Sequence, residues 1–459
     1  MRNTAKAGGL RSFQPAVTSL HENATGVPIS IWRGLDDMYK DAAERYKAYL
    51  AILQQQTQTE EEKNLPDFEQ VKQVNMILEP IAVNIDKKYW ENYLRRSSEA
   101  AKQYPEIINS SVMFVARNIM SYTYNTEGSR YAVPVIFYHV RFTASARAKD
   151  GQDLSHTIWA EGSTFEQMPD LATFTNQCKT AMESLLKLKD APVIDDAYSG
   201  PVLFEGTAVK DIFRRAFFSN NKLCAAPRMI QPVNNPQAQA QGGSNDFELM
   251  LNKKVIARSI TVKSITGQEF YNGQRLNGYY PVDAEGVVPD KELILIEDGV
   301  LRNMLNGRKP TKKIQNSNGH VRYDYNTNQW QVMPGNILIT SNQTFSNEEL
   351  RKKLLEAAKE EDLDYAYIVK LYSGGVRYLY KIYVADGREE LVRGAIISDD
   401  ANLKAFKRIL GASNRERIDS DNELQTTMIY PDAVLFEEMD ITRMPNIEFK
   451  KPYIVPKPN

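Results

Sequence analysis

The stretch Leu293-Ile294-Leu295-Ile296-Glu297-Asp298-Gly299-Val300-Leu301 is the strongest local fold signal in the chain. Two apolar runs flank an Asp-Gly pair, and this dipeptide favours a tight turn between antiparallel strands. We therefore predict a β-hairpin over residues 293–301. Apolar runs separated by turn residues recur from Phe247 onward, so the second half of the chain is predicted to be rich in strands.

A few helices interrupt the strands of this half. Ser346 with Glu349 three residues later forms a capping-box pattern, which predicts the start of a helix over 347–361. The remaining predicted elements are a hairpin about Asp386-Gly387 joining 376–384 to 389–398, a shorter helix over 402–410 and a strand over 433–436.

The first half opens with an amphipathic helix. Its apolar residues recur at spacings of three and four, so they lie on one face, and we expect that face to dock on a sheet or another helix. They are Leu35, Met38, Ala42, Tyr46, Tyr49 and Leu53. Residues 108–160 then favour three or four antiparallel strands. The other predictions are an extended start through Pro28, helices over 88–104 and 171–188, and a core position for Cys178.

Length favours two domains, because 459 residues exceed the size at which a single core usually stops growing. We place the boundary within 191–201. The predicted fold class is α+β, with an N-terminal helix and antiparallel-sheet domain over 1–195 and a β-rich C-terminal domain with a few packed helices over 196–459. The Gln- and Asn-rich stretch 231–245 is predicted to be a surface excursion of the second domain.

Charge and cysteine usage exclude several classes of protein. With 57 basic and 58 acidic residues, no net field attracts nucleic acid or an anionic membrane. The basic stretch 308–313 is interpreted as a solvated loop. Two cysteines are too few for a disulfide framework, and no apolar run is long enough to span a membrane, so we expect a cytoplasmic protein.

The four histidines give no local metal motif, since none has a second histidine or a cysteine within five residues. Phosphate-binding loops and a Gly-x-Ser-x-Gly nucleophile elbow are also missing from the sequence. A metal site assembled from distant residues stays open, with His139, His156 and His320 plus Glu205 as its candidate ligands.

Several blocks of the second half resemble the TldD/PmbA family, also called modulators of DNA gyrase. They are Tyr198-Ser-Gly-Pro-Val-Leu-Phe-Glu205, Gly278-Tyr-Tyr-Pro-Val-Asp-Ala-Glu-Gly286, residues 295–301, Asn316-Ser-Asn-Gly-His-Val-Arg322 and Pro334-Gly-Asn-Ile-Leu-Ile-Thr340. The first half is similar to a subgroup of the family through residues 35–42, 66–68 and Asn125-Thr-Glu-Gly128. The resemblance implies a further α/β stretch before these blocks, so we expect the chain to be shortened at its N-terminus.

In the family's active subunits, the helix after the first of these blocks carries His-Glu-x-x-x-His, which supplies two zinc ligands and a general base. In this sequence Arg214 and Arg215 occupy the His-Glu positions and Ser219 occupies the second His. A guanidinium has no free lone pair for a metal, and a lone serine is a poor zinc ligand. The family's C-terminal cysteine ligand also has no counterpart after Cys224.

The resemblance therefore implies a TldE/PmbA-like subunit without catalytic or metal-binding residues, paired with a zinc-bearing TldD-like subunit or with a second copy. No cofactor is expected in this chain itself. Its expected ligands are peptides or unfolded segments added along a sheet edge, with Asn318, His320 and Arg322 as candidate peptide contacts. Two alternatives stay open: an active metallopeptidase with an unrecognised site, and a gyrase-associated modulator.

Overall fold

The computed structural model describes residues 26–54, 60, 64–194, 197–219, 222–225, 247–324, 329–373, 376–397, 403–421 and 425–444. The predicted extended start through Pro28 lies outside these ranges up to residue 25 and is wrong for residues 26–28, which belong to a helix. The predicted excursion over 231–245 also lies outside the described residues. The N-terminal elements are α1 (Gly26–Leu53), β1 (Asn75–Ile77), α3 (Lys87–Glu99), a 3-10 turn (Ala100–Gln103), β2 (Asn109–Tyr124), β3 (Arg130–Arg147), β4 (Asp153–Gly162), a 3-10 turn (Phe165–Gln167) and α4 (Leu171–Asp190).

The N-terminal sheet is a long antiparallel meander, which confirms the predicted strands over 108–160. β3 pairs with β2 along one edge, and with β4 and the short parallel strand β1 along the other. Helices α3 and α4 cover one face of this sheet, where Trp90 of α3 stacks on Phe114 of β2 with ring centroids 3.7 Å apart. Cys178 lies in this core as predicted.

The C-terminal elements begin with β5 (Tyr198–Glu205), α5 (Thr207–Phe213), a π-helical turn (Arg214–Phe218) and a 3-10 turn (Glu248–Met250). The strands that follow are β6 (Ile260–Ser264), β7 (Phe270–Tyr271), β8 (Gln274–Arg275), β9 (Leu293–Glu297), β10 (Val300–Leu301), β11 (Val321–Asp324), β12 (Gln329–Val332), β13 (Asn336–Ser341) and β14 (Thr344–Phe345). The last elements are α7 (Asn347–Glu360), β15 (Tyr365–Ser373), β16 (Val376–Tyr383), β17 (Glu389–Val392), β18 (Ala395–Ile397), α8 (Leu403–Phe406), β19 (Ile409–Ser413), β20 (Glu416–Asp421), β21 (Thr426–Pro431) and β22 (Ala433–Arg443).

Two large sheets form the C-terminal body. One has the order β10-β9-β6-β13-β21-β20 and the other β14-β19-β22-β5-β15-β16-β17, with β18 added to β22. Helix α5 is buried in the core between them, and α7 covers the outer face of the second sheet. The molecule is α+β as predicted, whereas the division at residue 195 stays a prediction.

The turn and capping signals of the C-terminal body are confirmed. Asp298 and Gly299 have positive φ angles of 46° and 77° between β9 and β10, as a tight hairpin requires. Both hydrogen bonds of the Ser346–Glu349 capping box are present. Two predicted boundaries are wrong: the hairpin partner of β16 ends at residue 392, after which the chain crosses to β22, and the helix predicted over 402–410 shortens to α8 because β19 begins at residue 409.

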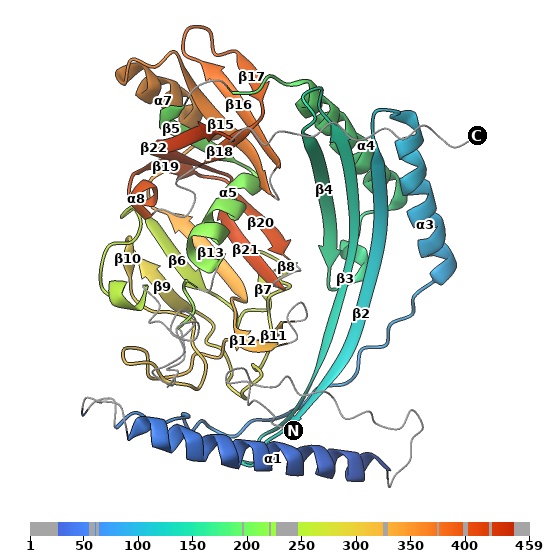
Figure 1. The fold of residues 1–459 in the computed structure, drawn as a ribbon, viewed down its shortest axis with the longest axis vertical. Helices are drawn as coiled ribbons and strands as arrows, with labels where there is room; N and C mark the ends of the chain where they lie inside the picture. Colours follow the sequence, from blue (N-terminus) through green and yellow to red (C-terminus); the bar gives the residue numbers. More distant parts are fainter. Residues whose placement is uncertain are drawn as a thin grey trace, which may run out of the picture.

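The N-terminal sheet is fastened to the C-terminal body at both of its ends (Figure 1). At the β2–β3 turn, the Glu127 carboxylate accepts two hydrogen bonds from the Arg308 guanidinium, at 2.7 and 2.6 Å. At the β3–β4 turn, Arg393 donates to Asp150 at 2.7 Å. Arg308 is only 2% exposed, so the interpretation of residues 308–313 as a solvated loop is wrong for this residue.

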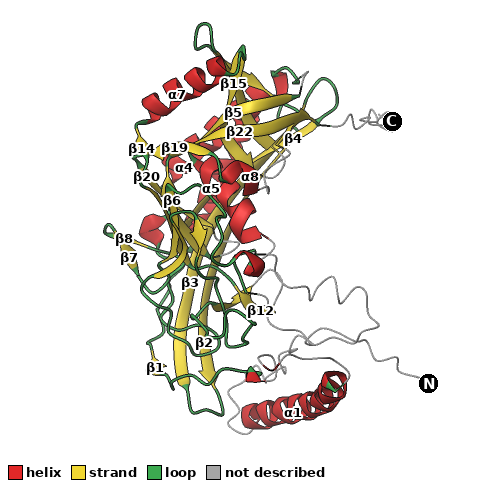
Figure 2. Cartoon of the chain, turned by 90° about the vertical axis from the view of Figure 1, so that its left-hand side faces the viewer, coloured by secondary structure: helices red, strands yellow, loops and turns green. Residues whose placement is uncertain are grey.

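Helix α1 is present, but its apolar face is not docked as expected. Leu35, Met38 and Tyr46 are each more than half exposed, and Figure 2 shows α1 standing apart from the sheets. The Tyr49 hydroxyl of α1 donates to Asp67 at 2.6 Å. Among the helices of the described ranges, α1 included, none combines the length and hydrophobicity needed to cross a bilayer.

Candidate functional site

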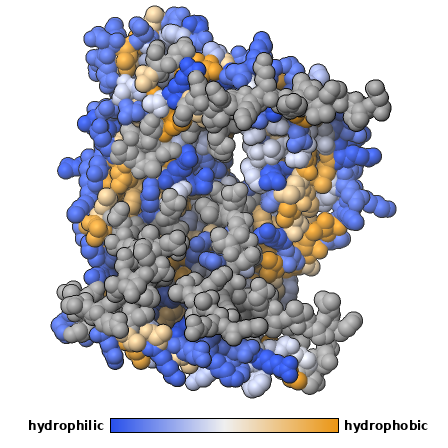
Figure 3. Space-filling model, in the orientation of Figure 1, coloured by the Kyte–Doolittle hydropathy of each residue, from blue (hydrophilic) through white to orange (hydrophobic). Residues whose placement is uncertain are grey.

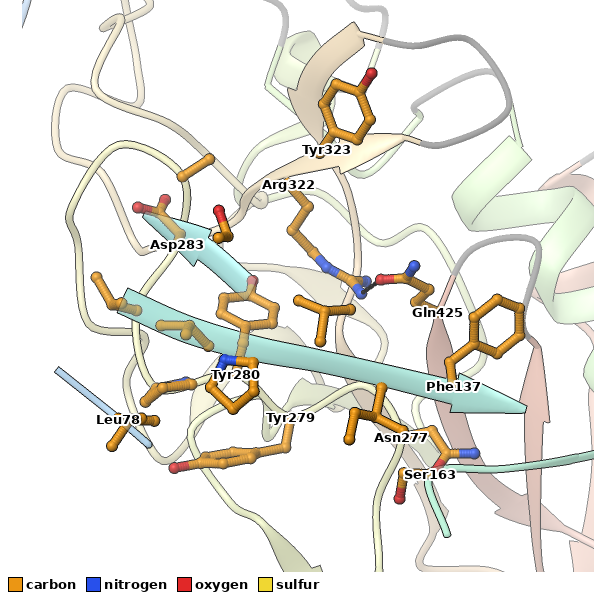
Figure 4. Close-up of a pocket in the computed structure, with 18 of the residues that line it drawn as sticks. Leu78, Phe137, Ser163, Asn277, Tyr279, Tyr280, Asp283, Arg322, Tyr323 and Gln425 are labelled. Carbon is orange, nitrogen blue, oxygen red and sulfur yellow. Dashed lines mark hydrogen bonds between the residues drawn. The ribbon is translucent and has the colours of Figure 1, made fainter. Parts of the chain in front are cut away.

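A cavity of about 500 Å³ lies between the N-terminal sheet and the C-terminal body. Residues 133–137 of β3 line one side of it, and the loop 275–284 with the β11–β12 hairpin lines the other. Figure 4 shows Tyr279 and Tyr280 beside the strand, and Arg322 reaching to Gln425. The two sides of this cavity belong to parts of the chain that are joined at both ends of the sheet, through Glu127–Arg308 and Asp150–Arg393.

The strand β3 has a gap in its pairing at this cavity. On this edge β1 pairs with residues 130–132 and β4 pairs with residues 138–147, which leaves residues 133–137 without a strand partner. Within the described ranges, no main-chain hydrogen bond from another segment fills the gap. We call these five residues the β3 gap.

The direction of the main-chain groups in the β3 gap follows from the neighbouring bonds. Arg130 donates to the Val74 carbonyl at 2.7 Å, and the Ala132 carbonyl accepts from Leu78 at 2.9 Å, so both residues face the β1 edge. Because alternate residues of a strand direct their N–H and C=O groups to the same edge, Pro134 and Ile136 face this edge too. Ile136 thus offers a donor and an acceptor in the cavity, and Pro134 offers an acceptor.

Arg322 and Tyr280 form the polar wall of the cavity. The Arg322 guanidinium donates to the Pro334 carbonyl at 2.7 Å and to the Gln425 side chain at 3.1 Å, and it lies 5.2 Å from the Tyr280 ring centroid. Tyr280 in turn donates to the Gly319 carbonyl at 2.8 Å. The loops that carry Tyr280, Pro334 and Gln425 are therefore joined through Arg322, which faces the β3 gap.

Asp283 stabilises the loop that follows Tyr280 on this side of the cavity. Its carboxylate accepts backbone N–H groups from Glu285, Val287 and Val321 at 2.9, 2.8 and 3.0 Å. Burial raises the pKa of Asp283 to about 7, against the opposing effect of these hydrogen bonds. Asp283 was not among the residues predicted from the sequence, although it lies within the block 278–286.

Of the three predicted peptide contacts, only Arg322 lines the cavity. His320 is 1% exposed, and its ring nitrogens lie 2.8 Å from the Ser264 hydroxyl and 2.9 Å from the Asn318 amide oxygen. His320 is therefore a buried, hydrogen-bonded residue of its loop. Asn318 donates to the Met304 carbonyl and accepts from the Asn306 N–H, so it braces the same loop. Peptide contacts by Asn318 and His320 stay predictions without structural support.

The positions that the resemblance aligns with the family's metal helix lie directly after α5, with Arg214 and Arg215 in the π-helical turn and Ser219 at its end. Arg214, Arg215 and Ser219 are half-buried. Arg215 donates to the Tyr372 hydroxyl at 2.8 Å, and its guanidinium lies 4.8 Å from that ring centroid. These side chains do not fit a zinc ion, because a guanidinium has no lone pair to give.

The distant histidines do not converge on one site. His139 and His156 belong to paired strands, but the first shares a face with Phe137 and Trp159 and the second lies on the helix-covered face, near Ala181. Glu205 accepts from Arg351 at 2.8 and 2.9 Å in the C-terminal body. Across the described ranges, no three His, Cys, Asp or Glu side chains are grouped as metal ligands.

The fold and the cavity define a class of α+β protein with two parts. In this class the unpaired β3 gap of the N-terminal sheet faces the C-terminal body across a cavity. The family described as the PmbA/TldA metallopeptidase C-terminal domain matches residues 198–443, which is more than half of the chain. The chain therefore belongs to the PmbA/TldD family. Comparison with curated proteins found no match.

Solved structures show the same fold at low sequence identity. A candidate modulator of a DNA gyrase from Thermotoga maritima has 18% identity and a TM-score of 0.58, with 83% of this chain and 81% of that chain covered. A candidate modulator of DNA gyrase from Bacteroides thetaiotaomicron has 11% identity and a TM-score of 0.54, with coverage of 85% and 80%. TldE from Thermococcus kodakarensis has 13% identity and a TM-score of 0.51, with coverage of 85% and 81%.

Proposed function

We propose that this chain is a non-catalytic, TldE/PmbA-like subunit that binds extended peptide or unfolded segments for a TldD-type metallopeptidase assembly. The observation that carries the proposal is the β3 gap, an unpaired length of strand edge that opens into a cavity. An incoming segment that pairs there completes the edge between β1 and β4. In this assembly the zinc ion belongs to a TldD-like partner, since Arg214, Arg215 and Ser219 do not fit it.

Backbone pairing suits ligands of varied sequence. The β3 gap spans five residues, which at the rise of a strand is roughly 16 Å of extended chain. Ile136 donates and accepts one hydrogen bond, and the Pro134 carbonyl accepts a further one. Side chains of the bound segment alternate between the two sides of the strand, so some of them meet Tyr279, Tyr280 and Arg322.

The test removes one main-chain donor without touching the rest of the sheet. Ile136→Pro deletes the N–H that faces the gap, and Ile136→Val is the matched control that keeps it. We expect fluorescently labelled casein, an unfolded protein, to bind the wild type and the valine variant alike, and the proline variant at least about ten-fold more weakly. Equal affinity of all three proteins for casein would refute binding at the β3 gap.

The catalytic part of the proposal has its own test. The purified chain is assayed for bound zinc and for casein cleavage with and without EDTA. We expect no cleavage by the chain alone, and cleavage only when a zinc-bearing TldD-like subunit is added. Stoichiometric zinc with EDTA-sensitive cleavage by this chain alone would establish the metallopeptidase alternative.

The gyrase-related names of two relatives suggest a second function, but no feature of this chain favours it. The formal net charge is −1, so the chain as a whole has no electrostatic attraction to DNA. Binding to duplex DNA that weakens steeply with added salt would support the gyrase-associated alternative instead.

A further inference from the structure

One face of the N-terminal sheet carries no helix and is turned toward the C-terminal body. Helices α3 and α4 cover the face formed by even-numbered residues of β3, such as Val140 and Phe142. Phe137, His139 and Arg141 therefore lie on the opposite face, and Phe137 lines the cavity next to the C-terminal body. In Figure 3 the surface is hollowed between this part of the sheet and the C-terminal body.

Two arginines and three rings form a continuous patch on this face. Trp159 of β4 lies opposite Arg141, whose guanidinium is 5.1 Å from the Trp159 ring centroid. Arg117 of β2 lies opposite Phe137, with its guanidinium 5.6 Å from that ring centroid. The His139 ring lies between the other two rings, with its centroid 5.3 Å from that of Phe137 and 5.5 Å from that of Trp159. We call these five residues the Arg141 patch.

Across the described residues, Arg141 has no ion pair with an Asp or Glu side chain. Its guanidinium reaches the Met113 sulfur at 3.9 Å, and a thioether is a weak acceptor. The Trp159 ring takes the flat side of the guanidinium, so N–H groups on its edge are suited to a planar anion. Trp159 is 40% exposed and Arg141 is half-buried, so a ligand can reach the pair from solvent.

The Arg141 patch is positively charged at neutral pH. Burial, Arg141 and Arg117 together lower the pKa of His139, so its imidazole stays neutral there. The odd-numbered residues within 111–119, 135–143 and 157–161 include these two arginines and one acid, Glu161 of β4. This surface therefore carries an excess of positive charge, although the formal net charge of the chain is −1.

The patch continues the path of a segment bound at the β3 gap. β4 takes over the edge of β3 at residue 138, so a segment paired along residues 133–137 has to leave the edge there. Helices α3 and α4 occupy one face, which leaves the face that carries the Arg141 patch. Arg141 lies four residues beyond Phe137 on β3, which is roughly 13 Å and about the length of four extended ligand residues.

We propose that the Arg141 patch is a second contact for the bound segment and selects unfolded segments with acidic side chains, a carboxylate being held by Arg141 beside Trp159. The inference rests on the proposed function, because it follows the same segment onward from the β3 gap. A carboxylate accepts two parallel, charge-assisted hydrogen bonds from a guanidinium, and a carboxamide of the same shape does not. Backbone pairing at the gap gives affinity, and the patch adds selectivity for acidic sequences.

The test compares two fluorescein-labelled peptides of about twelve residues, long enough to span the gap and the patch. In one peptide Glu alternates with Thr, and in the other Gln replaces every Glu. At physiological salt we expect the wild-type chain to bind the Glu peptide at least about five-fold more tightly than the Gln peptide.

Arg141→Met should bring this affinity ratio to about one and leave the affinity for the Gln peptide unchanged, which also reports that the variant is folded. Arg147→Met is the matched control. It removes the same charge from the same strand, but Arg147 already pairs with Asp153 at 2.6 Å, so the wild-type ratio should persist.

Equal binding of both peptides by the wild type, or an unchanged ratio in Arg141→Met, would overturn the proposal. An equal loss of the ratio in Arg147→Met would also overturn it, because the preference would then be general charge attraction. Ile136→Pro distinguishes this inference from the proposed function, since it should weaken both peptides alike. Unchanged binding by Ile136→Pro, with a Glu preference that still requires Arg141, would refute the β3 gap and not the selection by Arg141.

Discussion

Removing the Glu127 carboxylate should destabilise the protein far more than removing a carboxylate from a surface ion pair. Arg308 is 2% exposed, and its guanidinium contacts four groups. They are both oxygens of Glu127, the Glu69 carbonyl at 2.8 Å, the Glu285 carbonyl at 3.3 Å and the Phe68 ring, whose centroid is 4.1 Å away. In Glu127→Ala the guanidinium stays buried without its counter-charge. Loss of one partner from a buried pair costs about 3–5 kcal/mol, and since Glu127 is 35% exposed we expect about 3 kcal/mol.

The Glu297–Arg302 pair provides the matched control. Its N···O distance is 3.2 Å, and both side chains are nearly half exposed, so Glu297→Ala should cost less than about 1 kcal/mol. Urea unfolding followed by circular dichroism gives both free-energy changes, and hydrogen exchange of residues 122–131 shows whether the β2–β3 turn detaches. Equal destabilisation by the two variants, or an undisturbed turn in Glu127→Ala, would refute the view that this pair fastens the sheet.

Three further predictions concern separate parts of the molecule. Burial lowers the pKa of His320 from 6.5 to about 3, so its stabilising effect is complete above pH 6.5 and is lost as pH falls toward 3. Between pH 6 and 5 the free energy of unfolding of the wild type, relative to that of His320→Gln, should fall by about 1.2 kcal/mol, measured by urea unfolding at each pH, and a pH-independent difference would contradict this. Burial raises the pKa values of Cys178 and Cys224 to about 12, so a thiol reagent at pH 8 should label neither until urea unfolds the chain, and rapid labelling of the folded protein would contradict this. Ser346→Ala should cost about 1 kcal/mol through loss of the cap on α7, whereas Ser346→Asp should keep most of it; equal melting temperatures for wild type and the alanine variant would contradict the role of the cap.

Local signals predicted the local structure well. The Asp298-Gly299 turn, the Ser346 cap and the meander over 108–160 each depend on residues close together in sequence, and all three are confirmed. α1 shows the limit of such reasoning. Its apolar period predicted the helix, but the same period carries no information about which surface, if any, the face meets.

The candidate site could not be predicted from local sequence signals, because it depends on contacts between residues far apart in the chain. The β3 gap exists because β1 pairs with β3 only as far as residue 132, and β4 pairs with it only from residue 138. The sequence of β3 alone does not predict where the pairing with either strand ends. Pro134 within an apolar strand was the available signal, since proline in a sheet favours an edge that lacks a hydrogen-bonded neighbour. The burial of His320 was not predicted from the sequence, and it is possible because Ser264 and Asn318, from separate segments, satisfy both ring nitrogens.

The Glu127–Arg308 contact also sets a delay during synthesis. The two residues are 181 positions apart, so the β2–β3 turn leaves the ribosome well before its anchor has been translated. At typical translation rates that interval is roughly 10–40 seconds. During this interval the nascent β2–β3 hairpin exposes a long strand edge with few charges, and its turn lacks the contact with Arg308. We therefore expect this stage of synthesis to be the one at which chaperone binding matters most.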